Sequence, residues 1–165
     1  MVAWLYCDYN AQEHTVINMM GAILKLLVGG EIPDDIRKAF LGRTRPPLLS
    51  LMRILRTAIA SLPQVFICID ALDEFPANNL PELLESLKEI LQEFPKTRIF
   101  LTGRPHVKEA IQRYFVGAVA ISIFPNRDEI RKYVSSRLRG GYWVKRDSDL
   151  RTKIEEIIVE KMAER

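Results

Sequence analysis

One short segment constrains this chain more than any other, because a fully apolar run ends directly in acidic residues. The run is Val65–Ile69, and it is bounded by Pro63 and Asp70. Five consecutive apolar residues, several of them β-branched, are typical of a parallel strand that is buried on both faces. Such a strand needs parallel neighbours and helices that cover it. We therefore predict that Val65–Ile69 is a central strand of an α/β sheet.

Strand-like and helical segments alternate along the rest of the sequence. The helices are recognised by apolar residues that recur at helical spacing. This alternation implies right-handed crossovers and a mainly parallel sheet of about four strands, flanked by helices that cover both faces. The predicted strands are Val2–Cys7, Val65–Ile69, Arg98–Thr102 and Val119–Ile123, and the predicted helices are Thr15–Val28, a short one near Ile36–Phe40, Pro46–Leu62, Leu80–Phe94, Val107–Phe115, one capped by Asn126, and one from about Asp149 to the end.

Charge and cysteine usage exclude several classes of protein. The 24 basic residues are interspersed with 21 acidic ones, which does not favour a nucleic-acid surface. Cys7 and Cys68 each lie inside an apolar run and form neither a disulfide framework nor a zinc motif. No apolar stretch is as long as a membrane span, and the N-terminus does not resemble a secretory signal. We therefore expect an intracellular, cytoplasmic protein without a nucleic-acid or membrane partner.

Three acids follow the apolar strand. Asp70 stands at its end, and Asp73 and Glu74 come three and four residues later. In parallel α/β sheets, the ligand site lies at the carboxyl ends of the strands. A carboxylate at this place can hold Mg²⁺, which accepts few protein ligands and keeps waters and phosphate oxygens. A further acid nearby can orient or deprotonate a water molecule. The alternative is that these acids only cap a turn and face solvent.

A second strand end carries an arginine in a constrained turn. The segment is Thr102-Gly103-Arg104-Pro105, directly after the predicted strand Arg98–Thr102. The glycine and the proline favour a tight turn. Arginine at such a place can reach a terminal phosphate, because its planar guanidinium matches phosphate oxygens. The alternative is an ordinary surface turn.

These segments, in this order, resemble a known family. The acidic segment resembles the extended Walker B motif of NACHT proteins, which belong to the STAND class of P-loop ATPases, and Thr102–Pro105 resembles their sensor-1 segment. Ala3–Tyr9 resembles the second strand of the nephrocystin-3-like N-terminal variant, which is common in fungal ankyrin-repeat and related receptors. Ile121–Tyr133 resembles the stretch that follows the last strand of that core. Many relatives have glycine where this chain has Ala71.

The resemblance implies specific roles. Asp70 is expected to be the Mg²⁺ ligand, Asp73 or Glu74 a vestigial water-positioning residue, and Arg104 the residue that senses the terminal phosphate. In intact relatives the cofactor is ATP or GTP with Mg²⁺, and the nucleotide state is coupled to oligomerisation and signalling.

The sequence lacks the phosphate-binding loop that completes such a site. No Gly-x-x-x-x-Gly-Lys-Ser/Thr segment occurs in the 165 residues. The family's sheet order then predicts an incomplete P-loop NTPase-like core that misses its central P-loop strand, and thus a truncated domain with little or no ATP hydrolysis. We expect a partial nucleotide-binding core over residues 1–138. Residues 139–165 are expected to form a linker and a C-terminal helix leading toward a missing helical or winged-helix region.

Two other hypotheses stay open at this point. The chain can be a non-enzymatic interaction module that associates with itself or with related NACHT domains through strand edges or through the Leu-rich helix Leu80–Phe94. It can also be an unrelated metal-dependent phosphohydrolase that uses Asp70, Asp73 and Glu74. The second hypothesis lacks support from the two histidines, which show no metal-ligand spacing.

Overall fold

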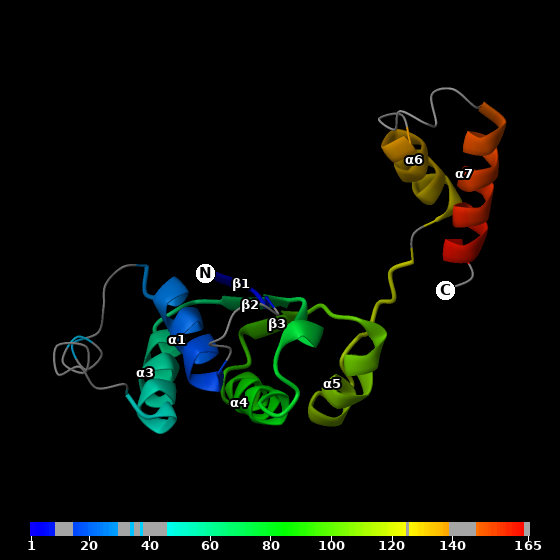
Figure 1. The fold of residues 1–165 in the computed structure, drawn as a ribbon. Helices are drawn as coiled ribbons and strands as arrows, with labels where there is room; N and C mark the ends of the chain where they lie inside the picture. The colour runs from blue at the N-terminus through cyan, green and yellow to red at the C-terminus, as the bar shows by residue number, and fades with distance from the viewer. Residues whose placement is uncertain are drawn as a thin grey trace. The chain divides into compact units, whose positions relative to one another are not determined.

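The fold was analysed in a computed structural model, which describes residues 1–8, 15–29, 34, 37, 46–124, 126–138 and 148–163. The chain divides into two compact units, Met1–Ala118 and Val119–Arg165 (Figure 1). The first unit is an α/β domain with a parallel sheet, as the sequence predicts. Apart from Arg37, the predicted short helix near Ile36–Phe40 lies outside the described residues.

The sheet of the first unit contains three strands in the order β1-β2-β3. They are β1 (Val2–Tyr6), β2 (Val65–Asp70) and β3 (Thr97–Leu101). Both pairings are parallel, with Trp4 opposite Cys68 and Cys68 opposite Phe100. The apolar run therefore forms the central strand, as predicted.

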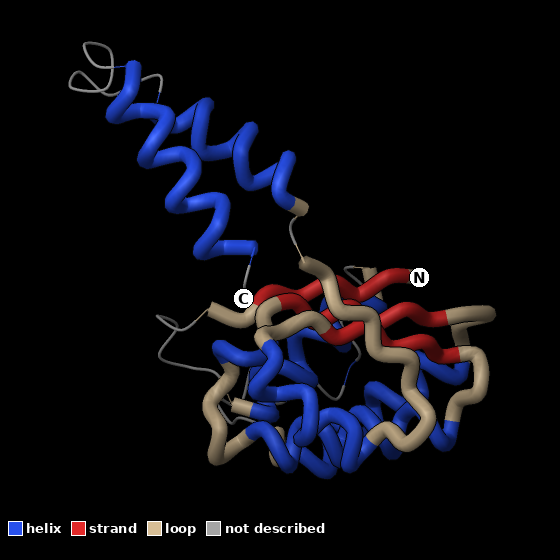
Figure 2. Tube along the Cα trace, turned by 90° about the vertical axis from the view of Figure 1, so that its right-hand side faces the viewer, coloured by secondary structure: helices blue, strands red, loops and turns tan. Residues whose placement is uncertain are grey.

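The described helices of the first unit lie on one side of the sheet (Figures 1 and 2). The chain moves across the sheet in one direction, from β1 to β2 to β3. Right-handed crossovers in one direction place every connecting helix on the same face. The helices are α1 (Val16–Leu27), α3 (Leu48–Ala60), α4 (Leu80–Glu93) and α5 (Lys108–Tyr114), with short 3₁₀ turns η1 (Leu72–Glu74) and η2 (Pro105–Val107).

The core lies between the sheet and these helices. Val65, Ile67 and Ile69 of β2 point into it and are almost fully buried. The leucines of α4 meet them there, so the Leu-rich helix belongs to the core and does not offer a free surface. The main buried side chains of α4 are Leu80, Leu83, Leu84, Leu87 and Ile90.

The opposite face of the sheet corrects one prediction. We expected β2 to be buried on both faces, but Phe66, Cys68 and Asp70 are only half-buried. Because all the crossovers wind in one direction, no described helix of Met1–Ala118 covers this face. On the neighbouring strands Trp4 and Phe100 are exposed. Among the described residues, one face of the sheet is therefore covered by helices and the other, called the open face below, is not.

The predicted fourth strand is also wrong. Residues Val119–Ile123 form no strand, and the described sheet has three strands where about four were expected. Val119, Ile121 and Ile123 are 81–89% exposed. Their alternation with small residues favours a strand, but a strand also requires a neighbour that accepts and donates its backbone hydrogen bonds.

The second unit is a helical hairpin of α6 (Arg127–Leu138) and α7 (Ser148–Ala163). Its small core consists of Ile130, Val134 and Val159. The predicted cap of α6 is confirmed as a reciprocal capping box, because Glu129 N donates to Asn126 Oδ1 at 2.8 Å and Asn126 N donates to Glu129 Oε2 at 3.0 Å. The predicted domain boundary between residues 138 and 139 stays a prediction.

Candidate functional site at the carboxyl edge of the sheet

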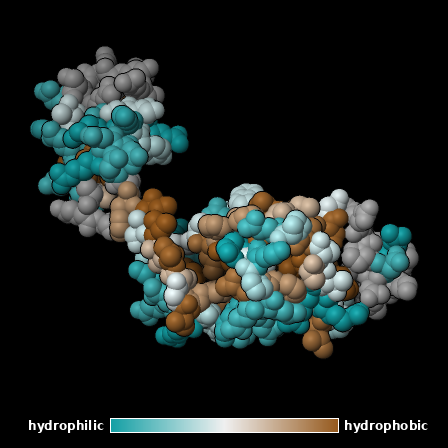
Figure 3. Space-filling view, turned by 180° about the vertical axis from the view of Figure 1, so that it is seen from behind, coloured by the Kyte–Doolittle hydropathy of each residue, from teal (hydrophilic) through white to brown (hydrophobic). Residues whose placement is uncertain are grey.

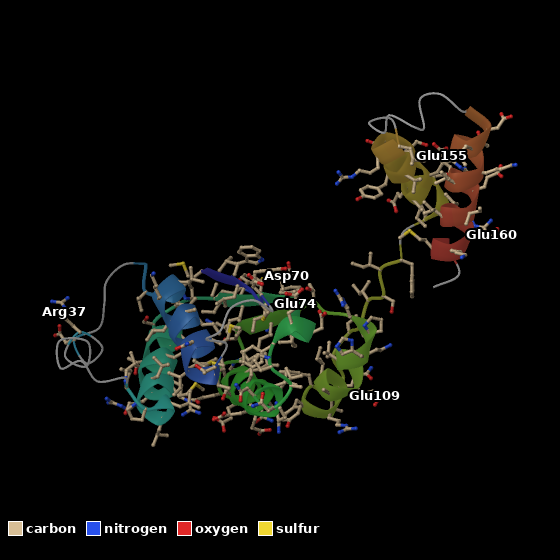
Figure 4. The ribbon with its side chains drawn as sticks, viewed as in Figure 1. Arg37, Asp70, Glu74, Glu109, Glu155 and Glu160 are labelled. Carbon is tan, nitrogen blue, oxygen red and sulfur yellow. The ribbon has the colours of Figure 1, made fainter. Side chains whose placement is uncertain are left out.

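The two strand ends singled out from the sequence lie at the same edge of the sheet. Asp70 is the last residue of β2, and Thr102 follows the last residue of β3. Figure 4 shows Asp70 and Glu74 close to each other at this edge. An ion pair between Asp73 and Arg104 links the two strand ends directly. The acidic segment and the arginine turn therefore form one cluster, as the sequence predicts.

One oxygen of Asp70 is held by its neighbours. The Thr102 hydroxyl donates to Asp70 Oδ1, and the Ala71 N–H donates to the same oxygen at 3.0 Å. The Ala71 N–H also lies 3.1 Å from Thr102 Oγ1. These bonds fix the orientation of the carboxylate. Thr102 was not assigned this role from the sequence; its signal is a hydroxyl at the end of the strand next to the acidic one.

Asp73 anchors the arginine turn. Its Oδ1 accepts a hydrogen bond of 3.1 Å from the backbone N–H of Arg104, and its Oδ2 lies 3.3 Å from Arg104 Nε. The Asp73 side chain is only 7% exposed, whereas that of Arg104 is 75% exposed. Both oxygens of Asp73 thus contact the turn.

Gly103 lets the two turns approach each other. A Cβ at this position would lie 2.9 Å from Val107 Cγ2 and 3.4 Å from both the backbone nitrogen and Oδ1 of Asp73. The first distance is below any ordinary carbon–carbon contact, since such contacts are most favourable at about 3.5–4.0 Å. Glycine is therefore required here for close packing.

Ala71 adopts a left-handed backbone conformation, with φ 55° and ψ 45°. This conformation is unfavourable for a residue with a Cβ and easy for glycine. Replacing Ala71 with glycine is expected to raise the free energy of unfolding by about 0.5–1 kcal/mol, because relief of strain exceeds the added freedom of the unfolded chain. Chemical denaturation of the variant would measure the difference. A loss of stability would show that Ala71 is not strained.

The acids of the cluster change the titration of two neighbouring residues. The negative charge of Glu74 is the main cause that raises the pKa of the Tyr6 hydroxyl, and burial and the charges of Asp8 and Asp70 raise it further. Burial, and then the charges of Glu74, Asp70 and Asp73, raise the pKa of the Cys7 thiol to about 11. Both shifts have the sign expected near a concentration of negative charge. The edge of the sheet is therefore an electronegative site.

The Cys7 shift predicts a loss of stability at alkaline pH. A thiol with an ordinary value of 9.0 and a folded pKa of about 11 stays neutral in the fold, so its contribution is complete below pH 9 and is lost between pH 9 and 11. The loss is roughly 2 kcal/mol. Denaturation curves at several pH values should show this loss in the native chain and in Cys68→Ala, but not in Cys7→Ala. An equal loss in Cys7→Ala would contradict the assignment.

The donor set at the edge suits a hard divalent cation. Within the described residues, no three His, Cys, Asp or Glu side chains are grouped as a metal site. Mg²⁺, however, is commonly held by only one or two carboxylates together with phosphate oxygens and waters. The half-buried Asp70 carboxylate, oriented through one oxygen, fits that requirement. Asp73 fits it less well, since both of its oxygens contact the arginine turn.

The fold and the site define an α/β protein with a parallel sheet and an acidic carboxyl edge. Residues 1–104 match the family model described as Nephrocystin 3, N-terminal, and the chain belongs to this family. The match includes all three strands, the acidic segment and Arg104. Comparisons with curated proteins and with solved structures give no match. Among the described residues, no helix combines the length and the apolar character that crossing a membrane requires.

Proposed function

We propose that this chain carries the Mg²⁺-binding and phosphate-sensing half of a NACHT-type nucleotide-binding signalling domain. The observation that carries the proposal is the juxtaposition of Asp70, Asp73 and Arg104 at the carboxyl edge of a parallel sheet. Binding sites of parallel α/β sheets lie at this edge. A bound Mg²⁺ would neutralise phosphate charge next to Asp70.

The contacts in the cluster suggest a separate role for each of its residues. Asp70 would hold the cation, with Thr102 fixing the orientation of its carboxylate. Arg104 would contact a terminal phosphate through the exposed end of its guanidinium while Asp73 holds the Arg104 backbone N–H and Nε. Asp73 would act mainly through the position of the turn, and Glu74 is the acid that we propose for orienting a water molecule.

The same residues are expected to bind nucleotide weakly by themselves. A Gly-rich loop supplies backbone N–H groups and a lysine to the phosphates, and the 165 residues contain no such loop. A cation and one arginine leave most phosphate oxygens without a partner from the protein. We therefore propose that this chain does not hydrolyse ATP or GTP efficiently.

Titration with Mn²⁺, as a paramagnetic substitute for Mg²⁺, tests the cation site. NMR signals near Asp70 should broaden at millimolar Mn²⁺ in the native chain and should stay sharp in Asp70→Asn. The matched control is Asp128→Asn, because Asp128 is an exposed acid of α6, 81% accessible, far along the chain from the site. Broadening that is indifferent to Asp70→Asn would refute the proposed cation site.

Nucleotide binding is tested separately by calorimetry with Mg²⁺ and a non-hydrolysable ATP analogue. We expect a dissociation constant in the millimolar range or weaker, and a further loss in Arg104→Ala. Micromolar binding would contradict the weak affinity proposed for this chain. Binding that is unchanged in both Asp70→Asn and Arg104→Ala would contradict the roles proposed for these two residues.

A specific observation also favours the second candidate function, a protein-interaction module. The open face of the sheet exposes Trp4, Tyr6 and Phe100, which are large aromatic residues. Exposed apolar patches of this kind often mark interaction sites.

A further inference from the structure

Tyr6 stands directly beside the residue that we propose as the cation ligand. It is the last residue of β1, and the parallel register pairs it with Asp70, the last residue of β2. Paired residues of neighbouring strands point to the same face of a sheet, and the strands lie about 4.8 Å apart. The Cys7 N–H donates to the Asp70 carbonyl at 3.0 Å, so the pairing continues past both residues. The side chains of Tyr6 and Asp70 therefore leave the sheet side by side.

The open face changes from apolar to polar at this edge. Its residues come from alternate positions of the three strands and form rows across them. The middle row is apolar and consists of Trp4, Cys68 and Phe100. The last row is polar and consists of Tyr6, Asp70 and Thr102. Brown and tan side chains lie among teal ones along the upper side of Met1–Ala118 in Figure 3, where Figure 1 places the sheet. A hydroxyl residue thus stands on each side of the Asp70 carboxylate.

The two hydroxyl residues have different reach. The Thr102 hydroxyl donates to Asp70 Oδ1, and the arginine turn follows Thr102 on the β3 side. Tyr6 lies on the opposite, β1 side. Its side chain is longer than that of aspartate, so its hydroxyl can extend beyond the carboxylate. A ligand held at Asp70 would therefore meet Arg104 on one side and the Tyr6 hydroxyl on the other.

The Tyr6 hydroxyl lies among carboxylates. Its pKa is raised mainly by the charge of Glu74, next by burial, and then by three further acids, Asp8, Asp70 and Asp73. Because the Coulomb energy falls with distance, the hydroxyl is close enough to respond to each of these charges. Two of the acids, Asp70 and Glu74, are seen together at this edge in Figure 4. Carboxylates only accept hydrogen bonds, whereas a phenol can donate one. Tyr6 therefore adds a donor to a group of acceptors.

A neutral donor suits this position better than a basic one. The ordinary pKa of the phenol, 10.0, is well above neutral pH, and the acids raise it further. A bound cation would offset the acids and let the pKa fall back toward its ordinary value, which still leaves the hydroxyl protonated. A lysine here would form ion pairs with the acids and compete with the cation for Asp70. Tyrosine can donate to a phosphate oxygen without weakening the cation site.

We propose that Tyr6 is a further ligand-binding residue of the site, and that its hydroxyl donates a hydrogen bond to an oxygen of a cation-bound phosphate group. The inference rests on the proposed nucleotide site and adds to it a contact on the side opposite Arg104. The ligand class is a polyphosphate with a divalent cation, either free or as part of a nucleotide. The tyrosine ring itself is not assigned to the nucleoside.

NMR titration of the full chain tests the phosphate contact with two probes. They are the Mg²⁺ complexes of tripolyphosphate and of a non-hydrolysable ATP analogue. Tyr6→Phe should weaken the binding of both probes by a similar factor, about two- to tenfold, which is what one net hydrogen bond contributes. The matched control is Tyr114→Phe. It removes the same group from a tyrosine of α5 that contacts Lys88 of α4, and should leave both affinities unchanged.

A second measurement uses the native chain and needs no phosphate. In a sample with isotope-labelled tyrosine rings, Mn²⁺ bound at Asp70 should broaden the ring signals of Tyr6 more than those of Tyr114. Tyr6→Phe should keep the Mn²⁺ affinity of the native chain, because the hydroxyl is proposed to contact phosphate and not the cation. A residue that only supported the fold would not separate the two affinities in this way.

The outcomes distinguish this inference from the proposed nucleotide site. That site fails, and the role of Tyr6 with it, if the native chain binds neither probe, or if Asp70→Asn and Arg104→Ala bind as well as the native chain. If those two variants lose binding and Tyr6→Phe does not, only the role of Tyr6 is overturned. A loss for the ATP analogue alone would show that the ring contacts the nucleoside, and sharp Tyr6 signals at saturating Mn²⁺ would place it away from the cation; both results would overturn the phosphate contact.

Discussion

Replacing Gly103 with alanine is expected to lower the free energy of unfolding by about 3 kcal/mol, since small-to-large changes at well-packed positions cost roughly 1–3 kcal/mol. The added Cβ would lie 2.9 Å from Val107 Cγ2 and 3.4 Å from the backbone of Asp73. Val107 is buried and has little room to move, and Asp73 is fixed by its contacts with Arg104. Urea denaturation measures the loss.

Gly21→Ala is the matched control for this prediction. Gly21 lies inside α1, and a Cβ there meets only Leu51 Cδ2, at an ordinary 3.9 Å. Alanine is favoured over glycine in a helix by up to about 1 kcal/mol, so this variant should be more stable than the native chain. If both variants gained stability, the two turns at the edge of the sheet would not be as tightly packed as described.

The central strand and the helices could be predicted because their signals are local. The apolar run Val65–Ile69 and the helical spacing of α4 are visible in a few consecutive residues. The open face could not be predicted in the same way. It depends on the direction in which the chain winds across the sheet, which is a property of the topology. The segment Val119–Ile123 has the residue pattern of a strand but forms none. A strand forms only beside a partner strand, and the residue pattern does not show whether a partner is present.

The candidate site was predicted in its outline and missed in its detail. Sequence spacing indicated that Asp70, Asp73 and Arg104 would meet at one edge, and they do. It did not indicate that Thr102 would orient Asp70, or that both oxygens of Asp73 would face the arginine turn. These contacts depend on side-chain directions across two loops. Nor did it indicate that Ala71 adopts a left-handed conformation.

Replacing Asp73 with alanine is expected to lower the free energy of unfolding by about 3 kcal/mol, because hydrogen bonds to charged groups contribute about 1.5–3 kcal/mol and the Arg104 backbone N–H loses its partner. Arg104→Ala removes only the ion pair of a side chain that is 75% exposed, so its cost should be about 0.5 kcal/mol. Asp73→Asn keeps an oxygen for the backbone N–H and should lie between the two. This order of stabilities follows if Asp73 holds the turn. Equal small costs for Asp73→Ala and Arg104→Ala would instead show that Asp73 does not hold it.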